Sequence, residues 1–103
     1  MGATGQQAAM AAGLAGGLGL CGAACGALGA AVWMTSLKHH QATGKPMDFK
    51  APQGLAVIAR FEQATGGVFQ CSKIAGRCFS AVEDHAQYLS QGGCTKVMAA
   101  LAG

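Results

Sequence analysis

Five cysteines give this 103-residue chain its clearest chemical potential, and they are Cys21, Cys25, Cys71, Cys78 and Cys94. Thiolates are soft ligands that suit zinc, copper(I) and iron–sulfur clusters, and four of them are normally needed to close such a site. The chain contains no Cys-x-x-Cys pair, so the spacing alone does not indicate zinc binding or thioredoxin-like exchange. The cysteines therefore predict either a metal centre or thiol redox chemistry.

Glycine pairs come shortly before two of these cysteines. Gly66-Gly67 precedes Cys71, and Gly92-Gly93 precedes Cys94. Glycine turns leave backbone N–H groups free, and such groups lower the pKa of a thiol and tune the sulfur atoms of a cluster. The alternative is that these cysteines only fill a core, because free cysteine is often a small buried hydrophobe.

A second candidate segment is residues 16–31, which consist mainly of glycine and alanine. If the segment is helical, Cys21 and Cys25 lie one turn apart on a stripe that continues with Leu28 and Val32. Each glycine costs a helix about 1 kcal/mol relative to alanine, so such a sequence is expected where another backbone or a cofactor comes very close. We therefore expect a tightly packed helix that presents its thiols inward.

Three segments follow one another in a characteristic order: Cys21-Gly22-Ala23-x-x-Gly26 behind Gly16-Gly17, the run from Phe61 through Gly66-Gly67 and Cys71 to Gly76, and Cys94-Thr95-Lys96-Val97. Together they resemble the C_GCAxxG_C_C family of redox-active proteins, over roughly residues 8–102. That family's pattern has four cysteines, one of which opens a Cys-Gly-Ala-x-x-Gly motif. Its first cysteine, on a helix upstream of the glycine-rich stretch, has no counterpart here. The connection from Gly17 to Cys21 is shorter than usual, and Cys25 and Cys78 are additional.

The resemblance implies redox work, and one relative with attached haem also carries an iron–sulfur cluster. We therefore expect the cysteines to bind a metal centre, with an iron–sulfur cluster as the first choice. The expected ligands are Cys21, Cys71 and Cys94, with Cys78 or Cys25 as the fourth. Covalently attached haem is not expected, because the chain has no Cys-x-x-Cys-His motif.

His85 is the other side chain with metal-binding chemistry near a cysteine. On a helix it lies two turns from Cys78 on the same stripe, so it is a candidate ligand or proton donor, or else an ordinary partly buried histidine. Cys78 and His85 are also conceivable as a nucleophile pair, but nothing supplies a third orienting group or an oxyanion hole. The chain is accordingly expected to be an electron-transfer or redox module more than a catalyst on its own.

Charge and composition restrict the class of protein. The formal net charge is +3, and the basic residues are scattered without interleaved aromatics, so nucleic-acid binding is not expected. The first residues lack the positive charge of a signal peptide, and the odd number of cysteines argues against a disulfide framework. Both observations favour a reducing, cytoplasmic location. Much of the apolar half of the chain is alanine, so a single domain over residues 1–103 is expected to need a homo-oligomer, a redox complex or a bound metal for stability.

The elements that must position these groups all have helical patterns. Helical spacing of apolar residues is found in residues 54–65, 71–74, 78–89 and 94–101, whereas no segment shows the alternation of a strand. The pattern predicts an all-α bundle of about five short helices with glycine-rich turns. The uncharged run before Lys38 is long enough to be tested as a membrane span, but its small residues and central glycines favour two buried helices, with membrane association as the lesser alternative.

Three functions remain open on the sequence. The first is an electron-transfer module whose thiols hold an iron–sulfur cluster. The second is a metal-free dithiol/disulfide protein, with Cys71 and Cys94 or Cys21 and Cys25 as the exchanging pair. The third is a structural subunit of a membrane or multi-protein complex, in which the Gly/Ala helices only pack. Metal content, thiol titration and detergent dependence distinguish the three.

Overall fold

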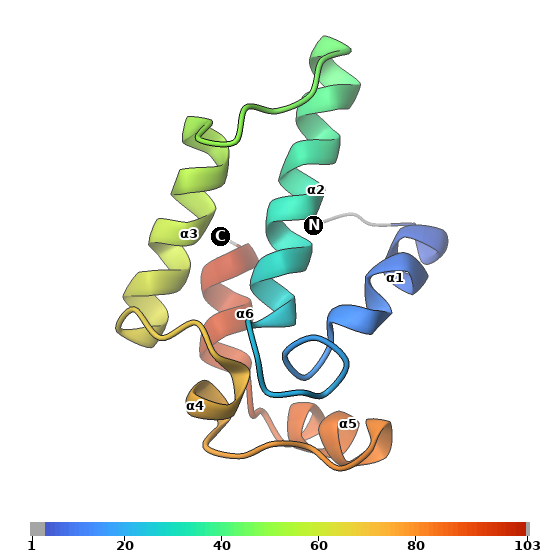
Figure 1. Ribbon diagram of the computed structural model, residues 1–103, viewed down its shortest axis with the longest axis vertical. Coiled ribbons are helices and arrows are strands. Elements are labelled where there is room, and N and C mark those ends of the chain that lie inside the picture. The colour runs from blue at the N-terminus through green and yellow to red at the C-terminus, as the bar shows by residue number, and fades with distance from the viewer. Residues whose placement is uncertain (1–3, 103) are drawn as a thin grey trace.

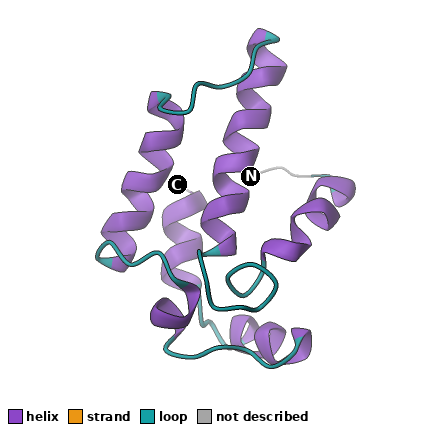
Figure 2. Cartoon of the chain, in the orientation of Figure 1, coloured by secondary structure: helices purple, strands orange, loops and turns teal. Residues whose placement is uncertain are grey.

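The computed structural model describes residues 4–102, which form six α-helices and one short 3-10 turn (Figure 1). In chain order they are α1 (Gly5–Ala11), η1 (Ala12–Leu14), α2 (Gly26–Thr43), α3 (Pro52–Thr65), α4 (Cys71–Ala75), α5 (Val82–Ser90) and α6 (Thr95–Ala102). Within this described part no strand occurs, and an isolated bridge joins Ala24 to Gln70 (Figure 2). The expected all-α class is confirmed, with six helices in place of about five.

Helices α2, α3 and α6 pack against one another and enclose the core (Figure 1). Phe61 of α3 is fully buried, and around it lie Ala31 of α2, Val57 of α3, and Val97 and Leu101 of α6. The small side chain of Ala31 lets the other helices come close to α2. The core is small, in line with the modest core expected from an alanine-rich sequence.

The ends of the helices follow the expected signals. Pro52 occupies the first turn of α3, where its missing N–H costs nothing. Gly44, Gly66 and Gly76 terminate α2, α3 and α4 in the left-handed conformation that glycine adopts without strain. None of the helices in residues 4–102 has both the length and the apolar character needed to cross a membrane.

The expected helix over residues 16–31 is wrong for its first part. Residues 16–25 are a loop, and six of them have positive φ: Gly16, Gly17, Leu18, Gly19, Leu20 and Gly22. A right-handed helix cannot pass through a series of left-handed residues, so α2 begins only at Gly26, directly after Cys25. Cys21 and Cys25 therefore do not share a helical stripe.

The helix expected over residues 78–89 also begins later than its pattern indicated. α5 starts at Val82, and Cys78 lies in the connection between α4 and α5. The carboxylate of Asp84, in the first turn of α5, accepts hydrogen bonds from the Ser80 N–H (3.2 Å) and from the Arg77 guanidinium. These contacts hold the residues before α5 in a non-helical conformation, which is extended at Ala81. His85 therefore lies on α5, whereas Cys78 does not.

Candidate functional site

Three cysteines that are far apart in the sequence line one small cavity of about 210 Å³. Cys25 comes from the residue before α2, Cys71 from the first turn of α4, and Cys94 from the residue before α6. His85 of α5 lines the same cavity, and Leu14, Leu89 and Met98 are among its apolar neighbours. No Asp, Glu, Lys or Arg is among the lining residues. The site is therefore a set of thiols and one imidazole in an uncharged, largely apolar enclosure.

Backbone hydrogen bonds hold the first two of these cysteines in place. The Cys25 N–H donates to the Phe69 carbonyl at 2.8 Å, and the Cys71 N–H donates to the Ala23 carbonyl at 2.7 Å. The next residue of α4, Ser72, donates to the Gly22 carbonyl from its backbone N–H (3.2 Å) and from its hydroxyl (3.0 Å). These hydrogen bonds join the loop before α2 to the start of α4 next to the two cysteines.

Two glycines allow this close approach. A Cβ atom at Gly26 would lie 1.9 Å from the Leu14 carbonyl oxygen, so only glycine lets the chain leaving η1 pass across the start of α2. At Gly17, where φ is +77°, a Cβ atom would lie 2.7 Å from the Cβ of Cys71. The expectation that the glycines of this stretch serve close approach is confirmed, although the contact is made by a loop and not by a continuous helix.

Burial raises the pKa of the Cys71 thiol, and the nearby thiols of Cys25, Cys94 and Cys78 raise it further. Burial is also the main reason for the raised pKa of Cys94, with Cys25 as the second cause. Both directions are opposite to the lowering expected from the glycine turns, because desolvation and repulsion between thiolates dominate here. In the metal-free protein Cys71 and Cys94 are consequently protonated at neutral pH.

The remaining two cysteines lie outside the cavity. Cys78 is exposed and close to Gly22, where a Cβ atom would come within 2.8 Å of its Sγ. It is near enough to Cys71 to affect the pKa of that thiol, but its side chain is not among the lining groups. Cys21 is exposed as well, and its thiol lies 3.8 Å from the Gly19 carbonyl oxygen in its own loop.

Of the five sequence candidates, the structure thus brings together Cys25, Cys71 and Cys94, places Cys78 beside them and leaves Cys21 apart. Within residues 4–102 no three Cys, His, Asp or Glu side chains are grouped closely enough to hold a single metal ion. One feature of the sequence points to Cys25 but was overlooked when residues 16–31 were interpreted as one helix. The tripeptide Cys-Gly-Ala occurs twice, at Cys21 and again at Cys25. The second copy is the one that opens α2 at the cavity.

The family comparison agrees with the resemblance seen in the sequence. The family described as "Putative redox-active protein (C_GCAxxG_C_C)" matches residues 2–103, essentially the whole chain. The chain belongs to this family. Comparison with curated proteins and with solved structures gave no match. As a C_GCAxxG_C_C protein the chain is a cysteine-rich, all-α member of a redox-active family, and its cavity cysteines are the groups on which such activity can rest.

Proposed function

We propose that this chain is a small electron-transfer module whose redox centre is an iron–sulfur cluster held by Cys25, Cys71 and Cys94. The observation that carries the proposal is that these three thiols, from three separate segments, line one cavity. Cysteine thiolates are the usual ligands of iron–sulfur clusters. Membership of a redox-active family supports the same role.

The chemistry of the donors supports a cluster. Three cysteines and one histidine line a cavity of about 210 Å³, and soft donors of this kind suit iron–sulfur clusters. Within residues 4–102 these side chains do not form a ready-made site for a single ion, so the support comes from the types of donor that share the cavity.

We assign the fourth position to His85. It is the histidine among the lining side chains, and histidine replaces cysteine at one iron of Rieske-type clusters, whereas the thioether of Met98 is not a usual ligand of such clusters. Its ring and that of Phe79 form a T-shaped pair, with the ring centroids 4.9 Å apart, which limits the rotation of the imidazole. Cys78 is the alternative fourth ligand, and it would have to turn inward from its exposed position.

When bound, the cluster supplies reversible one-electron transfer, and the chain's own residues set its surroundings. Leu14, Leu89 and Met98 contribute to a largely apolar lining, and an apolar shell around a centre influences its redox potential. Cys71 and Cys94 must lose their protons to become ligands. Because burial and neighbouring thiols hold their pKa values high, uptake of iron is expected to strengthen as the pH rises.

A metal-free dithiol is the second candidate, and one observation favours it. Cys71, Cys25 and Cys94 lie close enough for the charge of one thiolate to raise the pKa of another. Two of these thiols can close to a disulfide, with release of two electrons and two protons to an oxidant. This candidate requires no metal and makes use of the same cavity.

We also propose that the protein works in an assembly, as a homo-oligomer or as a subunit of a redox complex. Its core is small, and several large apolar side chains are exposed, among them Phe49, Leu55 and Val82. Such side chains are typical of surfaces that pack against another chain. Size-exclusion chromatography with light scattering tests this part of the proposal separately.

The cluster is tested by anaerobic purification, followed by an optical spectrum and determination of iron and acid-labile sulfide per chain. Visible absorption with stoichiometric iron and sulfide is expected, together with its loss in Cys71→Ala and Cys94→Ala. Colourless protein without iron, in which Cys71 pairs reversibly with Cys25 or Cys94 on oxidation, would reject the cluster in favour of the dithiol. Colourless protein without such a disulfide would reject both candidates.

A further inference from the structure

Cys78 is an exposed thiol beside the segment that carries the buried Cys71. It lies in the connection between α4 and α5, outside both helices. In Figure 1 this connection and the loop before α2 lie at the same end of the molecule. A Cβ atom at Gly22 of that loop would lie 2.8 Å from the Cys78 Sγ and 2.9 Å from the Ser72 Cβ. The Cys78 thiol is therefore close to the residue that follows Cys71 in α4.

Two glycines of the loop leave room beside these cysteines. A Cβ atom at Gly17 would lie 2.7 Å from the Cys71 Cβ, and Gly22 leaves the corresponding space beside Cys78. A side chain at either glycine would occupy the space next to one of the two cysteines. Burial is the main cause of the raised pKa of Cys71, and the Cys78 thiolate is a further, smaller cause, in agreement with their proximity.

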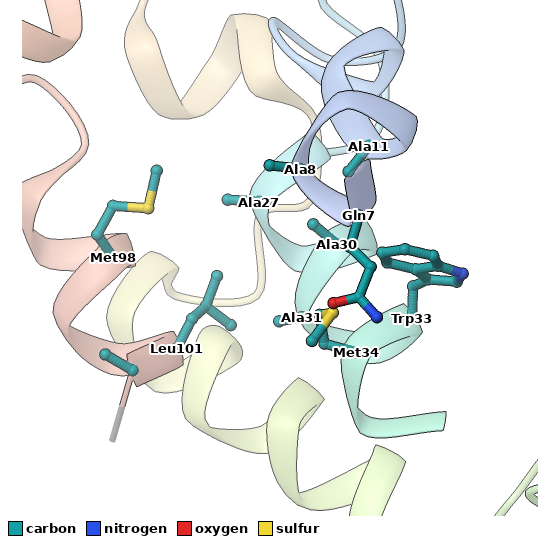
Figure 3. A pocket seen from close by; sticks show the side chains of 11 residues that line it. Gln7, Ala8, Ala11, Ala27, Ala30, Ala31, Trp33, Met34, Met98 and Leu101 are labelled. Carbon is teal, nitrogen blue, oxygen red and sulfur yellow. The ribbon is translucent and has the colours of Figure 1, made fainter. Parts of the chain in front are cut away.

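The cysteines of the cavity are poorly placed to meet a large reactant directly. Cys71 is buried, Cys25 and Cys94 are partly buried, and the cavity that they share has a volume of about 210 Å³. The apolar groove that adjoins it between α1, α2 and α6 has no cysteine among its described lining residues (Figure 3). A molecule that carries a disulfide can therefore be attacked at the surface by Cys78, whereas Cys71 is less accessible to it.

We propose that Cys78 is the surface thiol through which disulfides exchange with the buried Cys71. The substrate class is a molecule with a reactive disulfide bond. Exchange of this kind runs through a mixed disulfide. The exposed thiol forms that intermediate, and the buried thiol resolves it. The proposal rests on the redox function proposed above for the same site, and it adds the substrate class and the thiol that meets the substrate.

The two steps balance in atoms and electrons. The deprotonated Cys78 sulfur attacks a disulfide R–S–S–R, forms a mixed disulfide and releases one R–S⁻, which takes up a proton. The deprotonated Cys71 sulfur then attacks the Cys78 Sγ, closes a Cys71–Cys78 bond and releases the second R–S⁻, which is protonated in turn. Two protein thiols are oxidised while one substrate disulfide is reduced to two thiols, so no other oxidant is needed. Because Cys78 belongs to neither helix, its side chain can turn toward Cys71 without unwinding α4 or α5.

The probe is oxidised glutathione, added to the reduced, metal-free full-length protein. Free thiols are trapped at intervals with iodoacetamide in urea, and the disulfides are identified by peptide mass spectrometry. Trypsin leaves Cys78 and Cys94 on one peptide, residues 78–96, whereas a further digestion with Glu-C after Glu83 separates them. A Cys71–Cys78 bond is expected, with release of two glutathione thiols per chain. A mixed disulfide that persists on Cys78 while Cys71 stays free would overturn the proposal.

Cys78→Ser and Cys21→Ser form a matched pair, because each replaces an exposed cysteine. The Cys21 thiol lies 3.8 Å from the Gly19 carbonyl oxygen in its own loop, and it is not among the groups that raise the pKa of Cys71. Cys78→Ser should slow the oxidation of Cys71 by glutathione disulfide at least ten-fold, and Cys21→Ser should leave the rate unchanged. Equal rates of Cys71 oxidation in the two variants would contradict the proposal.

Cys71→Ser tests the second step of the exchange. This variant removes the resolving thiol, so glutathione should accumulate as a mixed disulfide on Cys78. A Cys78 that stays free in this variant would contradict the role of the surface thiol.

The outcome is separate from that of the proposed function, because every exchange measurement uses metal-free protein. Iron and sulfide bound by the natural chain would support the cluster whatever the exchange experiments show. A disulfide of Cys71 with Cys25 or Cys94 that forms as fast in Cys78→Ser as in the natural chain would overturn the role of Cys78. The same result would support the metal-free dithiol.

Discussion

Cys25 and Cys71 are joined through their neighbours by two crossing backbone hydrogen bonds, from Cys25 N–H to the Phe69 carbonyl and from Cys71 N–H to the Ala23 carbonyl. Each cysteine thus donates to a residue two positions before the other. The pairing fixes the two thiols at one cavity although 45 residues separate them in the chain. The two backbone hydrogen bonds therefore hold the segments that carry these cysteines beside each other.

Replacement of Gly26 by alanine is expected to destabilise the fold strongly. The new Cβ would lie 1.9 Å from the Leu14 carbonyl oxygen, and a backbone group cannot move aside as a flexible side chain can. A loss of more than about 2 kcal/mol of unfolding free energy is expected, measured by urea or thermal unfolding.

Gly29→Ala is the matched control for this measurement. Gly29 lies in the same helix, but its nearest neighbour is the Leu14 side chain at 3.7 Å, an ordinary contact. Alanine should stabilise the helix there by about 0.5–1 kcal/mol. If both substitutions changed stability equally, the close passage of Leu14 over the start of α2 would be wrong.

The metal-free protein should show slow alkylation of Cys71 and Cys94. Their raised pKa values leave little reactive thiolate at neutral pH, and Cys71 is also buried, whereas Cys21 and Cys78 are exposed. With iodoacetamide at pH 7.5, peptide mass spectrometry should find Cys21 and Cys78 modified first. The modification of Cys71 should accelerate as the pH rises beyond the ordinary range for a thiol. Equal alkylation rates for all five cysteines in the folded protein would contradict the raised pKa values of Cys71 and Cys94. The rates in urea, where all five are expected to react alike, serve as the reference.

Asp84→Asn is expected to lower stability at neutral pH. The Arg77 guanidinium and the Ser80 N–H hold the pKa of Asp84 below its usual value, so the carboxylate stabilises the folded state above the ordinary aspartate pKa of about 4. This contribution is lost as the pH falls through the lowered pKa. The difference in unfolding free energy between the variant and the natural chain should therefore shrink in acid. A difference that stays constant from pH 7 to pH 3 would show that the charge is not its source.

The same substitution bears on the site, because α5 carries His85 and Leu89 into the cavity. Asp84 fixes the first turn of that helix. If Asp84→Asn loosens the first turn of α5, any function that depends on the position of His85 should be weakened as well.

The fold was largely predictable because its helix ends carry strong local signals. Pro52, Gly66 and Gly76 mark the boundaries of α3 and α4. The apolar spacing predicted α3 as a helix but not its buried face, which holds Val57 and Phe61 while Leu55 is exposed. Cys71 and Cys94 were likewise identified from the glycine turns before them, and the structure places both at one cavity.

The conformation of the loop over residues 16–25 could not be predicted from local sequence. Leu18 and Leu20 adopt positive φ, a conformation that leucine rarely adopts. The sequence therefore gives no local signal for the left-handed backbone of this glycine-rich loop. That loop decides which of the two Cys-Gly-Ala copies faces the cavity. The pattern in the family's description is Gly-Cys-Ala-x-x-Gly, in which the last glycine lies four residues after the cysteine. This spacing is found from Cys25 to Gly29 and not after Cys21, where the fourth residue is Cys25 itself.

In the proposed redox centre the ligand is Cys25 and not Cys21. Iron and acid-labile sulfide are determined in anaerobically prepared Cys25→Ser and Cys21→Ser, with the natural chain as reference. Cys21→Ser should retain the iron and sulfide of the natural chain and Cys25→Ser should lose most of both, while circular dichroism shows equal helix content. Loss of iron and sulfide in Cys21→Ser with retention in Cys25→Ser would contradict the assignment.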